Sequence, residues 1–375
     1  TFLLGTTPLA VLYAAYEYAS THLGVYFAID GDRIPRQKGR NGSVHIRSGV
    51  TRQSQQPLFA RRGAVPYHDF PMGPVRRPTQ HHQSHFTTRG VSWFTAYPMG
   101  QDWWSADDYK AFSTQLVKLK MNTIATHTYA VEPTVWVGTA ANLSSDGRII
   151  GGSYNTTPWF HAMFPPHCIG CDHGNSVWGL VNRSTSDYTC GSGQFFPVDN
   201  FGSPLAAAYP TTSLPSQAQN IAAFEGAADL LKDAFGFARR LGVDAAIGVE
   251  VPLGVTYPWA NGTEKEHFEG IFTRLKKLDF PISQFWLYSS EGSMNAGVNS
   301  SSPSIQQIVK DAHTAVTALA TVWPEGNVTI AMSGWMLGPP DQPAYFDKVL
   351  PKEVTISSLD PNVGWDPVDP GWAQV

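Results

Sequence analysis

The sequence predicts an α/β protein: a (β/α)8 barrel of the TIM type, truncated after about six strands and preceded by part of a small α+β domain. In the second half of the chain, amphipathic helical segments alternate with short apolar strand segments, which indicates a parallel sheet with helical crossovers. No glycine-rich fingerprint follows any strand, which disfavours an open, doubly wound dinucleotide-binding sheet. We expect a partial N-terminal domain and linker at 1–57 and the barrel at 58–375.

The composition excludes two classes of partner. The net charge is only −4 and charged residues make up 15%, so a nucleic-acid footprint is not expected. The most apolar N-terminal stretch, residues 9–29, is interrupted by Glu17 and His22 and is too broken for a membrane span. Sparse charge, with 34 glycines, 28 prolines and 12 tryptophans, is typical of extracellular enzymes that act on sugars.

Acceptor motifs for N-glycosylation are unusually frequent. Seven of the thirteen asparagines stand in Asn-X-Ser/Thr, where chance gives about two or three. This predicts a secreted glycoprotein from a eukaryotic secretory pathway. The chain begins at Thr1 without a methionine or a signal peptide, so we expect a processed protein or a fragment. The motifs begin at Asn41, Asn142, Asn155, Asn182, Asn261, Asn299 and Asn327.

Three cysteines lie close together, at Cys168, Cys171 and Cys190. With His167 and His173, the first two have the spacing of a zinc knuckle. In an oxidising compartment, a disulfide from Cys190 to one of the other two is the simpler outcome. We therefore predict no metal and no cofactor, and the disulfide pairing stays open.

The first elements form the end of a small α+β domain. Thr7 and Pro8 open a helix with an N-cap hydroxyl and a first-turn proline, and Gly24 ends it. A strand at 25–29 and a turn at 30–32 follow. Residues 33–57 are polar and are expected to form a linker or an exposed hairpin.

A duplicated segment at 60–100 contains two rival versions of the first barrel strand. Residues 60–73 are echoed by residues 87–100, and in each copy Arg-Gly precedes a strand-like run that ends in Pro-Met-Gly. Only one copy can occupy the strand position. The first copy alone carries His68 and Asp69, whereas the second is contiguous with the elements that follow.

The other strands are expected near residues 123, 247, 286, 330 and 356, which gives six in all. A helix capped by Ser105 leads into the strand at 122–129, which carries His127 and Tyr129 at its end, with Glu132 just beyond. A long insertion at 130–215 has little periodicity, and such loops often form the walls of a cleft.

Acidic residues follow three of these strands, where the active sites of barrels lie. Glu291 comes after the aromatic strand 285–288, Glu250 ends the strand at 245–251, and Asp360 follows the last strand. Cleavage of a glycosidic bond needs a protonated carboxyl and a second carboxylate. We expect Glu291 to be the general acid, with its pKa raised by burial against Trp286 or Tyr288, and Asp360 the base. The competing interpretations are an ordinary loop acid at 291 and a turn cap at 360.

Aromatic and polar residues near the strand ends are candidates for substrate binding. Aromatic side chains would stack on sugar faces, although such residues often only close the core. The polar candidates would bind hydroxyl groups or, alternatively, form structural pairs. The set comprises His68, Asp69, His127, Tyr129, Glu132, Glu250, Trp286 and Trp335.

The N-terminal sequence resembles a known superfamily. Residues 3–17, Leu23-Gly24 and Asp30-Gly-Asp32 resemble the small domain before the barrel in α-glucuronidases of glycoside hydrolase families 67 and 115 and in the related hexosaminidases. The Arg-Gly opening and residues 116–122 are also similar, and the resemblance covers nearly the whole chain. It implies a general acid at the end of the fourth strand, which is Glu291, and an aspartate after the sixth, which is Asp360.

The sequence departs from this superfamily at two points. Hexosaminidases of this group place an aspartate directly before the acid, and here that residue is Ser290. The further carboxylate that family 67 places after the seventh strand has no counterpart. A hexuronic acid substrate would need a cation, for which Arg62 and Arg89 are candidates.

These features together predict a secreted, α-glucuronidase-like glycoside hydrolase that acts on a plant or algal polysaccharide. Its expected partner is the polysaccharide or oligosaccharide substrate, with no nucleic acid and no membrane. Two alternatives remain open: a non-catalytic glycan-binding protein on a barrel scaffold, and a hexosaminidase-type hydrolase.

Overall fold

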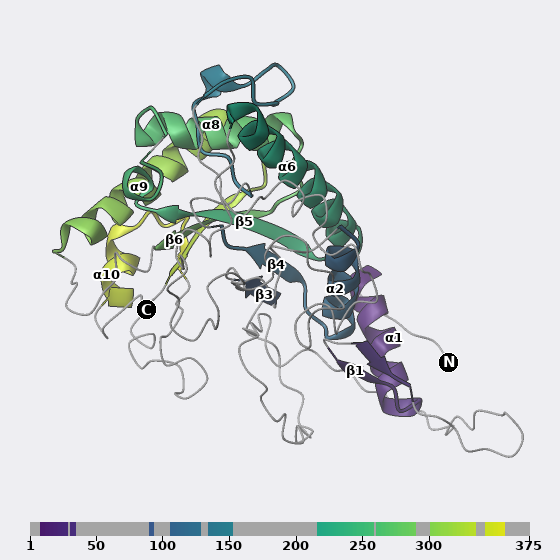
Figure 1. The fold of residues 1–375 in the computed structure, drawn as a ribbon. Coiled ribbons are helices and arrows are strands. Elements are labelled where there is room, and N and C mark those ends of the chain that lie inside the picture. The colour runs from purple at the N-terminus through teal and green to yellow at the C-terminus, as the bar shows by residue number, and fades with distance from the viewer. Residues whose placement is uncertain are drawn as a thin grey trace, which may run out of the picture.

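A six-stranded parallel sheet forms the centre of the protein (Figure 1). In the computed structural model, the residues described are 8–28, 31–34, 90–93, 106–128, 134–152, 216–258, 260–289, 301–334 and 342–356. The strands lie side by side in the order of the sequence. They are β3 (Gly90–Trp93), β4 (Thr123–Thr126), β5 (Asp244–Val251), β6 (Gln284–Ser289), β7 (Thr329–Gly334) and β8 (Thr355–Ile356).

The predicted α/β class is therefore confirmed, with all six strands near the expected positions. Each neighbouring pair is parallel, so a helix or a longer crossover has to connect consecutive strands. Strand β3 comes from the second copy of the duplicated segment, and the first copy lies outside the described residues.

Helices cover one side of this sheet, as Figure 1 shows. Their apolar faces meet alternate strand residues, among them Val249, Phe285 and Met332, in one hydrophobic core. Full burial of a large apolar side chain contributes about 1.5–3 kcal/mol, so this layer supplies much of the folding free energy. The helices are α2 (Ala106–Lys118), α6 (Gln217–Arg240), α8 (Glu264–Lys277), α9 (Pro303–Val322) and α10 (Gln342–Val349).

Local signals in the sequence set the helix ends. Helix α8 begins with a capping box, in which the Thr263 hydroxyl accepts from the Glu266 amide while the Glu266 carboxylate accepts from the Thr263 amide at 2.8 Å. These bonds lower the pKa of Glu266. Near the N-terminus, Gly24 has a φ of 70° two residues after the helix that ends at His22, as the sequence predicts for a helix stop.

The N-terminal unit packs on α2. It consists of helix α1 (Pro8–His22) and an antiparallel pair, β1 (Tyr26–Ala28) and β2 (Gly31–Arg33). The Tyr13 hydroxyl donates to the Met121 carbonyl oxygen at 2.9 Å, and Lys118 forms an ion pair with Asp32 at 2.6 Å. These contacts attach the unit to the helix that leads into β4.

The first part of the long insertion, residues 134–152, is called the strap here because it packs against α6 and α8. Trp136, Leu143 and Ile149 from the strap form a small hydrophobic cluster with Phe224 of α6. On α8, a β-carbon at Gly270 would lie 1.9 Å from the Gly138 carbonyl oxygen. Only glycine allows the strap to approach this close. The rest of the insertion lies outside the described residues.

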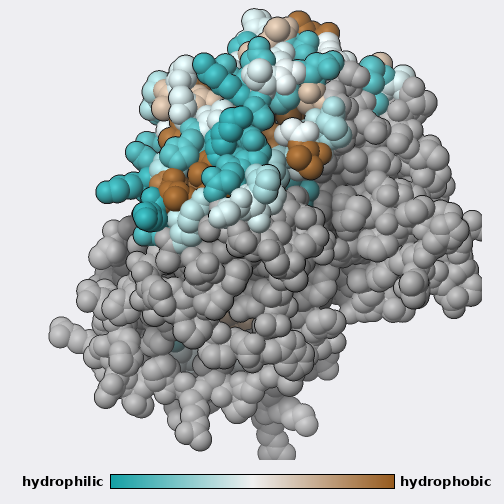
Figure 2. All heavy atoms as spheres, turned by 90° about the vertical axis from the view of Figure 1, so that its left-hand side faces the viewer, coloured by the Kyte–Doolittle hydropathy of each residue, from teal (hydrophilic) through white to brown (hydrophobic). Residues whose placement is uncertain are grey.

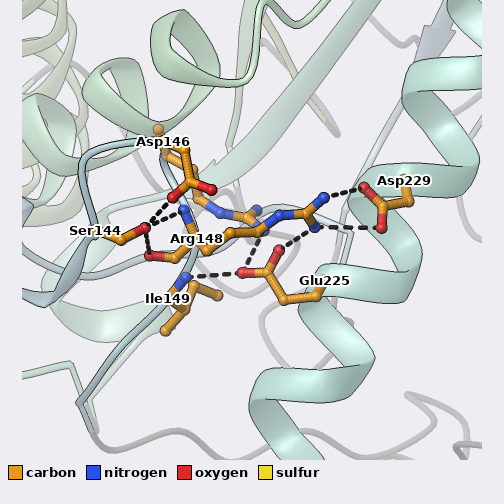
Figure 3. Close-up of polar contacts among 7 residues, drawn as sticks. Ser144, Asp146, Arg148, Ile149, Glu225 and Asp229 are labelled. Carbon is orange, nitrogen blue, oxygen red and sulfur yellow. Dashed lines mark hydrogen bonds and ion pairs between the residues drawn. The ribbon is translucent and has the colours of Figure 1, made fainter.

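Four charged residues, called the outer network here, connect the strap to both helices. They are Arg148, Glu225, Asp229 and Arg274, of which Figure 3 labels the first three. Arg148 lies between the two carboxylates of α6, at 2.6 Å from Glu225 and 2.9 Å from Asp229, and these contacts raise its pKa. Glu225 also accepts from the Ile149 amide at 2.8 Å and lies 3.1 Å from Arg274.

The outer surface of the helical layer is mostly polar. Figure 2 views the side on which α9 and α10 lie, and there hydrophilic residues surround small, separate hydrophobic spots on the described surface. No helix in the described part of the chain is both long and apolar enough to cross a lipid bilayer.

Candidate functional site

The face of the sheet opposite to α6, α8 and α9 is lined by small residues and aromatics. Alternation along the strands places Ala246, Gly248 and Glu250 of β5 on this face, because Ile247 and Val249 belong to the core beneath the helices. A β-carbon at Gly248 would lie 2.1 Å from the carbonyl oxygen of Trp286, so this position requires glycine. The absence of a side chain there lets the backbone and β-carbon of Trp286 lie directly against β5.

Four residues form a polar group at the carboxyl edge of this face: His127, Glu250, Tyr288 and Ser333. We call them the carboxyl-edge cluster. The strand register places Glu250 beside Tyr288 and Tyr288 beside Ser333. All four are nearly inaccessible to solvent, with relative exposures of 6% or less. The edge at which parallel strands end is where catalytic groups of α/β enzymes lie.

Direct contacts join three of these side chains. Nε2 of His127 lies 3.5 Å from Oε1 of Glu250. The ring of Tyr288 meets the imidazole of His127 edge-on, with centroids 4.5 Å apart, and stacks on Trp286 with centroids 5.7 Å apart. The arrangement combines a carboxylate acceptor, an imidazole and two aromatic rings within one patch.

Buried polar atoms without a hydrogen-bond partner gather near the same edge. Within the described residues they include the hydroxyl groups of Thr126, Thr128 and Ser289 and the indole nitrogen of Trp286. Buried polar groups in proteins are nearly always paired, and each exception costs about 1–3 kcal/mol. Alternation along the strands puts Trp286 on the face of Glu250, whereas Thr126 and Ser289 lie on the helix side with Ile124 and Leu287. The unpaired indole nitrogen is therefore the atom that favours this face as a functional site.

Three of the predicted site residues are therefore brought together: His127, Glu250 and Trp286. The prediction treated them as separate candidates on different strands. The other seven lie outside the described residues, namely Glu291, Asp360, His68, Asp69, Tyr129, Glu132 and Trp335. The three cysteines and the candidate cations Arg62 and Arg89 lie outside them as well.

Sequence reasoning did not assign Ser333 to the site, and it treated Tyr288 only as a source of burial for Glu291. The signal that identifies both is their register with Glu250, because it places three side chains in one row across β5, β6 and β7. Register between distant strands is not readable from local pattern.

Two further findings bear on the site. In the described ranges, no group of three or more His, Cys, Asp or Glu side chains is arranged to hold a metal ion. Comparison of the sequence with models of known protein families and with curated proteins finds no match.

Proposed function

We propose that this protein is a secreted glycoside hydrolase, of the α-glucuronidase type, that acts on a plant or algal polysaccharide. The carboxyl-edge cluster is the observation that carries this proposal. It offers a carboxylate and an imidazole 3.5 Å apart beside the stacked rings of Trp286 and Tyr288. Sugars present both hydroxyl groups, which donate to carboxylates, and apolar faces, which pack on aromatic rings.

We further infer that the sheet is the larger part of a (β/α)8 barrel. Two features support this: the six parallel strands follow one another in sequence order, and the helices lie on one side of them. A doubly wound sheet instead reverses its strand order and carries helices on both faces. In a barrel, the face that bears Glu250 and Trp286 points inward, toward the mouth where substrates bind.

The chemistry of the proposed reaction needs two carboxyl groups beyond the cluster. Glu291 follows the last residue of β6 by two positions and is proposed as the general acid. Asp360 follows β8 by four positions and is proposed as the base. Within this scheme, Glu250 and His127 bind sugar hydroxyl groups next to the bond that is cleaved, and Trp286 packs against a sugar ring. The oxygens of the two carboxyl groups lie about 6.5–9.5 Å apart in inverting enzymes and about 5–5.5 Å apart in retaining ones.

Secretion is part of the same proposal. Of the three acceptor asparagines within the described residues, Asn261 and Asn327 are exposed and Asn142 is partly buried. Exposed positions between secondary-structure elements accommodate glycans without disturbing the core. Digestion with an N-glycosidase, followed by mass spectrometry of the secreted protein, is expected to find glycans at Asn261 and Asn327.

The decisive test replaces the proposed acid. Glu291→Gln keeps the shape of the side chain but removes its proton-donating capacity. We expect sugar release from glucuronic acid-bearing plant xylans or algal polysaccharides to fall by about 100-fold or more, since general acid catalysis typically contributes about 100- to 10,000-fold. Glu353→Gln, which alters an exposed acid before β8, is the control and should act at the wild-type rate.

Two outcomes would redirect the proposal. If Glu291→Gln released sugar as fast as the wild type, the assigned acid would be wrong. Tight binding of a polysaccharide without any product would favour the glycan-binding alternative. An N-acetyl thiazoline inhibitor separates the hexosaminidase type, and it is expected not to bind because position 290 is serine.

A further inference from the structure

A buried acid on α9 contacts the turn that follows Glu250. Asp311 is fully inaccessible to solvent. Its Oδ2 accepts from the Leu253 amide at 2.8 Å, and its Oδ1 accepts from the Gln307 side chain at 2.9 Å. Leu253 opens the short helix α7 (Leu253–Thr256), where an amide has no partner within the helix itself. Asp311 thus supplies the acceptor that this turn requires.

The turn matters because the end of β5 is supported on one side only within the described sheet. The ladder between β4 and β5 stops at Ile247, whereas the ladder to β6 continues to Val251. Residues 248–251, which include Glu250, therefore extend beyond the β4 ladder. The contact from Asp311 to Leu253 fixes the chain three residues after Glu250 and limits how far this end can move.

We propose that Asp311 is a positioning residue for the carboxyl-edge cluster: by anchoring Leu253 from α9, it fixes Glu250 at the distance from His127 that substrate binding requires. This inference rests on the proposed function for its catalytic consequence, but the positioning itself concerns only the protein. Burial raises the pKa of Asp311, against the opposing effects of the Leu253 amide and Gln307, so the protein keeps an energetically costly group at this position.

The charged groups around Asp311 belong to α8 and α9. Gln307 also donates to Glu264 at 3.4 Å, and Lys310 lies 3.8 Å from Glu264. Gln307 thus donates to both Asp311 and Glu264 and connects the two acids. A neutral asparagine at 311 can still accept from Leu253, because the Gln307 amide can turn to accept from the new NH2 group. Alanine at 311 cannot replace either bond.

This difference gives a matched set of variants. Asp311→Ala removes the anchor and Asp311→Asn preserves it. Glu225→Ala and Glu225→Gln are the controls, because Glu225 likewise accepts a backbone amide from another segment at 2.8 Å but lies in the outer network. Glu250→Gln gives the reference for a changed cluster. The readout is the ring resonance of His127 in protein labelled with 13C at histidine, recorded at one pH.

We expect Asp311→Ala to shift the His127 resonance in the same direction as Glu250→Gln, and Asp311→Asn to restore its wild-type position. Glu225→Ala should leave it in place even where its thermal midpoint falls as far. On a substrate that the wild type cleaves, Asp311→Ala should lower kcat by about 10–100-fold, as expected when a group is displaced by a fraction of an ångström to one ångström, and KM should change less.

Equal disturbance of His127 by Asp311→Ala and Glu225→Ala, or none by either, would overturn the proposal and leave Asp311 a purely structural residue. If Asp311→Ala does not fold, Asp311→Ser, which keeps a buried hydroxyl but shortens the side chain so that it reaches Leu253 less well, is measured together with hydrogen exchange at the Leu253 amide. Faster exchange with a smaller shift of His127 in the expected direction supports positioning, and an unmoved resonance overturns it. Because the resonance needs no substrate, this result is independent of whether Glu291→Gln retains activity.

Discussion

Glu225 and Glu250 are both largely shielded acids, yet their surroundings are opposite. Glu225 has two arginines within 3.1 Å and a backbone amide at 2.8 Å. Within the described residues, Glu250 has one close polar partner, the imidazole of His127, at 3.5 Å. The outer network matches charge with charge, whereas the carboxyl-edge cluster keeps a carboxylate that is weakly engaged.

The two regions therefore contribute differently to the stability of the fold. A buried arginine such as Arg274, only 4% exposed, is tolerated because a carboxylate faces it, although burial still lowers its pKa. On the face of the cluster, the indole nitrogen of Trp286 lacks a hydrogen-bond partner among the described residues, which lowers stability. A region that costs stability is retained for another reason, and substrate binding is the reason proposed above.

The largest expected effect breaks the outer network. Glu225→Leu removes the carboxylate that faces Arg274 and leaves a buried guanidinium without its partner. We expect a loss of about 3–5 kcal/mol in the free energy of unfolding, measured by urea denaturation. Lys265→Ala, which removes an exposed pair with Glu269 at 3.7 Å, is the control and should cost less than about 1 kcal/mol. Similar losses in both variants would contradict the assigned role of the network.

The second effect concerns the carboxyl-edge cluster, where we expect a large loss of activity and only a small loss of stability. Glu250→Gln is expected to lower the rate of sugar release by about 10–100-fold, the effect of weakening a charged hydrogen bond of about 1.5–3 kcal/mol to a sugar hydroxyl, while the free energy of unfolding changes far less than in Glu225→Leu. Initial rates on a polysaccharide that the wild type cleaves, together with urea denaturation, check both parts. Full activity with a large loss of stability would show that Glu250 is a structural acid like Glu225.

The third effect compares two glycines that permit close backbone contacts. Gly270→Ala would force α8 away from the strap, and Gly248→Ala would force β5 away from Trp286, because in each case the opposing atom is a backbone carbonyl oxygen. Both should lose about 1–3 kcal/mol of stability, but only Gly248→Ala should also slow sugar release. Gly226→Ala in α6, with nothing within 4 Å of the new β-carbon, should gain up to about 1 kcal/mol.

The helices and strands were predictable from the sequence, whereas the strap that carries part of the outer network was not. Strands such as 245–251 were predictable because their apolar runs are local, and α8 was predictable from the 3.6-residue spacing of Phe268, Ile271 and Leu275. The strap was not predicted as a packed element, because its stability comes from contacts between distant residues, such as Arg148 with Glu225. A hydrophobic period cannot report a contact across 77 positions.

The site was predictable in kind but not in arrangement. Acids and aromatics at strand ends identified His127, Glu250 and Trp286 as candidates. Their assembly into one cluster depends on the register of β4, β5 and β6, which three-dimensional packing fixes. The role of Asp311 was not predictable either, because a helix acid in the sequence is ordinarily an exposed one.

The smallest expected effect is a pH dependence of stability, and it compares Asp311 with Glu266, whose pKa is shifted in the opposite direction. Burial raises the pKa of Asp311 above its ordinary value of 3.8, so the folded protein keeps a proton that the unfolded chain releases. Its protonation therefore contributes stability below about pH 4, and this contribution is lost as the pH rises through the folded-state pKa. Asp311→Asn cannot titrate there. The free energy of unfolding of the wild type minus that of Asp311→Asn should decrease from about pH 4 to pH 7.

Glu266 provides the opposite sign within the same molecule. The Thr263 amide and hydroxyl lower the pKa of Glu266, so its stabilising contribution is present above its unfolded-state pKa and is lost as the pH falls through the folded-state value. The free energy of unfolding of the wild type minus that of Glu266→Gln should therefore increase with pH over the acidic range. Urea denaturation at intervals of pH measures both differences. Curves of the same sign would show that burial does not control the titration of Asp311, and would remove the energetic argument that this acid is kept at a cost for the sake of Glu250.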